Sequence, residues 1–175
     1  MLVRSVGLFW REDFVYWGAG IKAGKLLGVP SKAITSDPID FRDQVGIYAL
    51  YADYDMAYVG QAGVGNQTLF DRLKQHRKDD LAGRWNRFSW FGILRVLADG
   101  TMANKAAALK PPKVADVLNH IEAILIHAAE PPMNSQGGRF GESVIRYTQV
   151  RDERLGPSSD EMLRMLSKEA SERKR

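Results

Sequence analysis

The stretch that decides the fold is QVGIYALYADYDMAYVGQAGVGNQTLFDRLKQH, residues 44–76. It holds two runs rich in aromatic and β-branched residues, VGIYALY and MAYVG, which are separated by ADYD. Such runs around a short polar segment predict a β-hairpin. The residues that follow the hairpin have helical periodicity and a basic character, so the stretch predicts a hairpin packed against a helix.

The register of this hairpin decides where its tyrosines lie. A three-residue loop at 53–55 would place Leu50 opposite Tyr58 and Tyr48 opposite Gly60. Side chains alternate between the two faces of a strand, so Tyr48 and Tyr58 would then lie diagonally on one face. A slip of one residue would place them on opposite faces.

The glycine-containing segment QAGVGNQ (61–67) leads into a predicted helix that begins near Asn66 as its N-cap and continues through TLFDRLKQHRKDD. Three apolar residues form its buried side: Leu69, Phe70 and Leu73. Arg72 and His76 are four residues apart and therefore project from the same side of the helix. One guanidinium and one imidazole are thus expected beside each other.

The flanking regions predict further short elements. FSWFGILRVL (88–97) is typical of a core strand that ends in the turn ADG. VGLFW (6–10) and DFVYW (13–17) predict short strands, AGKLLGV (23–29) predicts one or two helical turns, and TMANKAAALKPPK (101–113) predicts a loop or short helix. We expect the aromatic residues near the N-terminus to pack against the main domain rather than to stack on bases.

A second long helix is predicted over 114–129. Its apolar residues recur at helical spacing and predict a buried stripe: Val114, Val117, Leu118, Ile121, Leu125 and Ala128. Glu122 borders this stripe, where a partly desolvated carboxylate needs a partner, either a bound cation or a nearby arginine. Pro131 and Pro132 end the helix, and the turn MNSQGG could direct Asn134 back toward it.

Composition narrows the class of protein. The 175 residues are 45% hydrophobic, which suffices for one sizeable core, and the absence of cysteine excludes disulfides and thiolate metal sites. The N-terminal apolar run is too short for a signal peptide, and no segment reaches membrane-spanning length, so we expect a cytoplasmic protein with no membrane partner. The net charge is +4, and residues 72–87 contain six basic and two acidic residues. This basic run is either a nucleic-acid contact or a solvated helix face.

Five elements in order now resemble the GIY-YIG nuclease family. GIY at 46–48 is followed by YVG at 58–60, then by Arg72 on a helix, Glu122 on a later helix and Asn134 after that helix. The resemblance covers about 45–137, over half of the chain. The pairing of Arg72 with His76 is most similar to the restriction-type members.

The resemblance implies an α/β (α+β) fold, a small sandwich whose central, mostly antiparallel three-stranded sheet is flanked by helices. We assign it to residues 44–150, with an N-terminal extension at 1–43 and a C-terminal helical tail at 151–175. It also implies a divalent-metal-dependent endonuclease that hydrolyses DNA phosphodiester bonds, with no small-molecule cofactor.

For the metal, the resemblance implies Glu122 as the single protein ligand of one Mg²⁺ or Mn²⁺ ion per active site. Arg72 would grip a non-bridging phosphate oxygen as negative charge develops. Asn134 would hold Glu122 or the backbone in place by hydrogen bonds.

For water activation, we assign Tyr48 as the general base and Tyr58 as the residue that orients the water or the phosphate. A free phenol titrates near about 10, so nearby cations would have to lower that value. His76 is the reserve base, because an imidazole acts at neutral pH without any shift.

Double-stranded DNA is the expected partner. We expect five basic residues to contact its phosphates: Lys74, Arg77, Lys78, Arg84 and Arg87. A stand-alone restriction-like or phage-defence nuclease is the leading hypothesis, and double-strand cleavage would require a homodimer on DNA. The alternatives are a structure-selective or non-specific nicking nuclease of repair or mobile elements, and a catalytically silent nucleic-acid-binding module.

Overall fold

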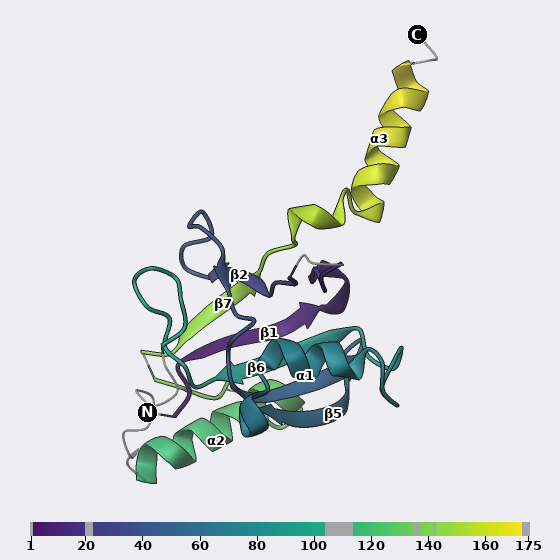
Figure 1. Cartoon of the computed structure of the whole chain (residues 1–175). Coiled ribbons are helices and arrows are strands. Elements are labelled where there is room, and N and C mark those ends of the chain that lie inside the picture. The colour runs from purple at the N-terminus through teal and green to yellow at the C-terminus, as the bar shows by residue number, and fades with distance from the viewer. Residues whose placement is uncertain (1, 20–22, 104–113, 135–136, 142, 173–175) are drawn as a thin grey trace.

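A computed structural model describes residues 2–19, 23–103, 114–134, 137–141 and 143–172. Within these residues the strands are β1 (Ser5–Arg11), β2 (Leu27–Pro30), β3 (Ile39–Asp40), β4 (Gly46–Ala52), β5 (Asp55–Ala62), β6 (Arg87–Gly92) and β7 (Ile145–Gln149). They form one mixed sheet in the order β3-β2-β7-β1-β6-β4-β5 (Figure 1). Neighbouring strands are antiparallel except for β1 and β7, which are parallel.

The three antiparallel strands expected from residues 44–92 are present as β5, β4 and β6. The prediction of a three-stranded central sheet is nevertheless wrong, because the sheet has seven strands. Residues 1–43 supply three of them, and β1 lies inside the sheet between β6 and β7. This segment is therefore part of the core sheet and not a peripheral extension.

Residues 23–29 show why the N-terminal segment was misread. Helical turns were predicted there, but the segment ends in β2, which pairs with β3 on one side and with β7 on the other. Gly28 lacks a side chain, and a Cβ atom there would lie 2.7 Å from the ring of Trp10. Pairing on both edges and this close aromatic contact outweigh the local helical preference. The first two residues of DFVYW, Asp13 and Phe14, lie in a short 3-10 helix (Glu12–Phe14) and not in the predicted strand.

The register predicted for the hairpin is confirmed, because Leu50 pairs with Tyr58 and Tyr48 pairs with Gly60. The three-residue loop is wrong, since Ala52 pairs with Asp55 and leaves a two-residue turn. A bulge in β5 lies between the pair Tyr51–Met56 and the pair Leu50–Tyr58. Its one extra residue compensates for the turn that is one residue shorter than predicted. An inserted residue of this kind keeps the pairing beyond it in register.

The helix α1 (Leu69–His76) begins two residues later than predicted. Thr68 is its N-cap, and Thr68 and Asp71 form a reciprocal capping box. Asn66, the predicted cap, instead lies in the turn before the helix with φ of 60°. The predicted apolar side of α1 is confirmed as buried, and it packs on the face of the sheet that carries Tyr48 and Leu50.

The helix α2 has the predicted bounds, Val114–Ala129, but the prediction of its buried side is wrong. Four of the six residues of the predicted stripe are exposed: Val114, Leu118, Ile121 and Leu125. The buried positions of α2 are His120, Ala123 and Ala128. The helix packs through them on the other face of the sheet, against a cluster that includes Ala49 and Tyr51.

Hydrogen bonds and small residues explain this orientation of α2. The amide of Val3 donates to Nδ1 of His120 over 2.8 Å, and the Tyr51 hydroxyl donates to the carbonyl of Ala128 over 2.9 Å. Gly138 approaches so closely that a Cβ atom there would lie 2.4 Å from Cα of Ala123. The side of α2 that carries Ala123 permits this approach because its side chains are small. The side that carries Leu118 and Leu125 would not permit it.

The C-terminal helix α3 (Ser159–Glu172) confirms the predicted helical tail and extends away from the sheet (Figure 1). Its apolar residues are largely exposed: Met162, Leu163, Met165 and Leu166. Most of the segment predicted as a loop or short helix, 104–113, lies outside the described residues. Among the described helices, none is long and apolar enough to cross a membrane.

Trp10 tests whether the N-terminal segment belongs to the core. It is 2% exposed, packs edge-on against Phe88 and Trp90, and donates its indole N–H to the carbonyl of Tyr147 over 3.2 Å. We expect Trp10→Ala to lower the free energy of unfolding by about 3–5 kcal/mol. Urea denaturation measures this loss. Ile34→Ala, at a site that is 70% exposed, is the control and should change it by less than about 0.5 kcal/mol.

Candidate active site

Two tyrosines of the hairpin and one histidine of α1 form an aromatic cluster. The rings of Tyr48 and Tyr58 lie 6.2 Å apart, which confirms that they share a face of the hairpin. The ring of His76 lies 5.8 Å from Tyr48 and 4.9 Å from Tyr58. The last turn of α1 therefore lies over both tyrosines.

A chain of two short hydrogen bonds passes through His76. The Tyr48 hydroxyl lies 2.7 Å from Nε2 of His76, and Nδ1 of His76 lies 2.7 Å from Oδ2 of Asp79. Sequence reasoning missed Asp79. The signal was its position three residues after His76, a spacing that brings side chains together at the end of a helix.

Arg72 also lies beside this cluster, next to Tyr48 and Tyr58. Its Nε atom is buried and has no hydrogen-bond partner among the described residues, while Nη1 donates to Oε1 of Gln75 over 2.9 Å. The adjacent Tyr48 and Tyr58 hydroxyls raise the pKa of Arg72, which remains a cation. A buried guanidinium N–H without a partner is a position where an anionic oxygen would bind.

The protonation of Tyr48 follows from its burial. Desolvation raises the pKa of Tyr48 above 10, although Arg72 opposes this rise. Tyr48 is therefore a neutral phenol at neutral pH and not a ready base. This changes the role that we expected for it.

Only part of the cluster can be reached from outside. Tyr48 is 0% exposed and His76 is 3% exposed, whereas Tyr58 and Arg72 are partly exposed. A ligand would thus meet Tyr58 and Arg72 first, with Tyr48 and His76 behind them.

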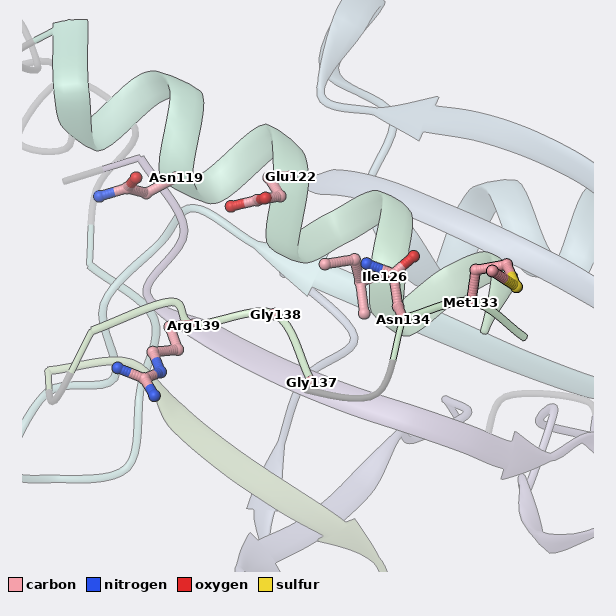
Figure 2. A pocket seen from close by; sticks show the side chains of 8 residues that line it. All are labelled: Asn119, Glu122, Ile126, Met133, Asn134, Gly137, Gly138 and Arg139. Carbon is pink, nitrogen blue, oxygen red and sulfur yellow. The ribbon is translucent and has the colours of Figure 1, made fainter. Parts of the chain in front are cut away.

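Glu122 and Asn134 lie together, but in a different place. They line a hollow of about 460 Å³ beside α2, together with Asn119 and Arg139. Figure 2 shows this hollow between α2 and the segment that carries Gly138 and Arg139. Since α1 and α2 cover opposite faces of the sheet, the structure groups Glu122 with Asn134 and does not bring them to the tyrosine cluster.

The two groups differ in their ability to hold a metal. In the tyrosine cluster the nearest carboxylate, Asp79, is occupied: Oδ2 bonds His76, and Oδ1 accepts the Leu81 amide over 2.9 Å. Glu122 is exposed and forms no hydrogen bond or ion pair with any described residue. Together with the amide oxygens of Asn119 and Asn134 it offers the hard oxygen donors that Mg²⁺ and Mn²⁺ prefer. No cluster of three or more acidic or histidine ligands exists in the described part of the chain.

Three of the five residues expected to bind DNA have partners within the protein. Arg77 pairs with Glu12 over 2.5 Å and lies over the ring of Trp17. Lys74 lies over Phe70, and Arg87 lies over Tyr54. The other two, Lys78 and Arg84, are exposed, and their side chains form no hydrogen bond or ion pair within the described residues. They are the ones best placed to contact phosphates.

No family model, no curated protein and no solved structure matches this chain. Its function is therefore inferred from the residues and the geometry of the two sites.

Gly60 tests the packing of the tyrosine cluster. A Cβ atom there would lie 2.3 Å from the Tyr48 hydroxyl and 2.8 Å from the Tyr58 ring. We expect Gly60→Ala to displace both rings and to cost about 1–3 kcal/mol of stability. The control is Gly137→Ala, where the nearest atom would be an ordinary 3.6 Å away. Equal stability of the two variants in urea denaturation would contradict the packing described here.

Proposed function

We propose that this protein is an endonuclease that hydrolyses DNA phosphodiester bonds at the tyrosine cluster. One observation carries the proposal: the guanidinium of Arg72, whose buried Nε has no hydrogen-bond partner among the described residues, lies beside the hydroxyls of Tyr48 and Tyr58, and the Tyr48 hydroxyl bonds His76. A fixed cation next to a hydrogen-bonded proton acceptor provides what hydrolysis of a phosphodiester requires. The order of the GIY, YVG, Arg72, Glu122 and Asn134 elements in the sequence supports the same reaction.

Arg72 is the proposed phosphate ligand. A guanidinium presents several N–H donors in one plane, a geometry that matches two oxygens of a phosphate. Because Nη1 donates to Gln75, the donors left for the phosphate are Nη2 and the buried Nε. The interaction strengthens as negative charge builds on the phosphate oxygens, and this favours the transition state over the bound substrate.

His76 is the proposed final proton acceptor. The attacking water meets the partly exposed Tyr58, and its proton is passed through Tyr58 and the buried Tyr48 to Nε2 of His76. The hydroxide oxygen then forms the new bond to phosphorus. The bond to the departing 3′ oxygen breaks, and that oxygen keeps the electron pair and takes a proton from solvent. Tyr48 acts here as a relay, since its raised pKa makes it a poor base by itself.

Glu122 is the proposed ligand of one Mg²⁺ or Mn²⁺ ion, with the Asn119 and Asn134 amides in the same hollow. Such an ion stabilises negative charge only on oxygen atoms that it contacts. The hollow lies on the far side of the sheet from Arg72, so the steps given above use the tyrosine cluster alone.

Double-stranded DNA is the proposed substrate, because residues 72–87, which include part of α1 and the turn after it, contain six basic and two acidic residues. A restriction-like or phage-defence role is proposed from the sequence resemblance, and a homodimer would be needed to cut both strands. A nicking nuclease and a catalytically silent DNA-binding module are the alternatives. A plasmid cleavage assay distinguishes these candidates, because they differ in whether they cut both strands, one strand or neither.

Arg72 and Glu122 are tested by plasmid cleavage with Mg²⁺ or Mn²⁺. We expect Arg72→Lys to lower the single-turnover rate by on the order of 10²-fold, because a lysine lacks the planar N–H donors. Because the α2 hollow lies on the far side of the sheet from Arg72, we expect Glu122→Gln to weaken Mn²⁺ binding in isothermal titration calorimetry and to leave the cleavage rate unchanged. Glu130→Gln, in the residue that follows α2, is the control for metal binding. Loss of cleavage in Glu122→Gln would contradict a mechanism confined to the tyrosine cluster. DNA binding without cleavage by the native protein would favour the silent module.

Lys78 and Arg84 are tested by the salt dependence of DNA binding. Each phosphate contact releases counterions, so the double variant Lys78→Ala with Arg84→Ala should reduce the slope of log K against log salt by about 2. Arg77→Ala is the comparison and should change the slope less than either of these substitutions, because the Arg77 side chain is paired with Glu12. An unchanged slope in the double variant, measured by fluorescence anisotropy, would place the DNA elsewhere.

A further inference from the structure

We propose that Asp79 is a positioning residue that holds His76 in the tautomer able to accept a proton from Tyr48. The inference rests on the proposed nuclease function and adds the group that gives the proton transfer its direction. It is carried by the 2.7 Å contact between Nδ1 of His76 and Oδ2 of Asp79, at the end of the ring opposite Tyr48.

The position of Asp79 is itself constrained. Its Oδ1 accepts the amide of Leu81 over 2.9 Å, so the turn that follows α1 fixes the orientation of the carboxylate. The backbone carbonyl of His76 accepts the indole N–H of Trp85 over 3.3 Å. Both the imidazole and its carboxylate partner are therefore held by contacts outside the pair.

The ionisation of Asp79 decides which ring nitrogen carries the proton. Although burial opposes it, the hydrogen bonds from Leu81 and His76 lower the pKa of Asp79, so the carboxylate is ionised at neutral pH. An ionised carboxylate only accepts hydrogen bonds, and Nδ1 must therefore donate to it. In the neutral imidazole this leaves Nε2 with a free electron pair toward the Tyr48 hydroxyl.

The groups that surround the His76 ring support this assignment. Tyr48 reaches it from β4, Tyr58 packs against it from β5, and Arg72 lies one turn earlier on α1. Asp79 is the one carboxylate in hydrogen-bond contact with the ring among the described residues. Once Nε2 receives the proton, this carboxylate stabilises the imidazolium while remaining ionised. Without it, a proton on Nε2 would face Tyr48 and block the transfer.

Asp79→Asn tests the inference, with Asp80→Asn as the matched control. Both changes remove one negative charge at adjacent positions, but no side-chain contact of Asp80 is found among the described residues. The asparagine at 79 can still accept the Leu81 amide. We expect Asp79→Asn to lower kcat by on the order of 10²-fold or more with KM unchanged, and Asp80→Asn to leave both unchanged.

Nitrogen-15 NMR of the His76 ring supplies a measurement that does not depend on cleavage. We expect the native protein to carry its proton on Nδ1 and Asp79→Asn to shift the population toward Nε2. Native protein protonated on Nε2, or native kcat in Asp79→Asn, would overturn the inference. If the native protein cuts no DNA but shows the Nδ1 tautomer, the proposed function fails while the positioning by Asp79 stands. If Asp79→Asn does not fold, the tautomer of His76 in the native protein alone tests the inference.

Discussion

The alternation of side chains along β4 is the constraint on which the rest of the structure depends. Tyr48 and Leu50 point to the face covered by α1, and Ala49 and Tyr51 point to the face covered by α2. Because β4 lies between β5 and β6, a register slip of one residue would turn buried side chains of both faces away from the cores that they fill. The same alternation delivers Tyr48 to His76 and leaves no space for α2 on that side. One strand thereby assembles the tyrosine cluster and separates it from Glu122.

The residues of the tyrosine cluster differ in burial, and their proposed chemical roles differ accordingly. A tyrosine in water would face solvent directly, but Tyr48 is enclosed by Gly60, Tyr58 and His76. Enclosure makes the phenol harder to ionise, and the hydrogen bond to His76 provides another route for its proton. The partly exposed Tyr58 and Arg72 are left to meet a ligand. The roles that we propose for His76 and Asp79 are those of a buried base and of the carboxylate that orients it.

The apolar side of α2 shows that area alone does not select a buried face. Leu118 and Leu125 are both more than half exposed, while the smaller Ala123 is 0% exposed. Close approach of Gly138 and the bonds to His120 and Ala128 set this orientation. Hydrogen bonds have strict distance requirements, whereas apolar contact is non-directional, so the polar groups determine the rotation of the helix. A pattern of apolar residues at helical spacing is compatible with either rotation.

The sequence by itself determined the elements whose causes are local. Alternation of side chains indicated that Tyr48 and Tyr58 share a face of the hairpin. Helical spacing indicated the bounds of α2 and the projection of Arg72 and His76 from one side of α1. Tertiary structure alone decided which strands join β4 in the sheet, which side of α2 is buried, and that Asp79 bonds His76. These features depend on contacts between residues distant in the chain or on the path of a turn. A one-dimensional pattern does not select among them, because many packings satisfy the same periodicity and the spacing of Asp79 from His76 permits their contact without requiring it.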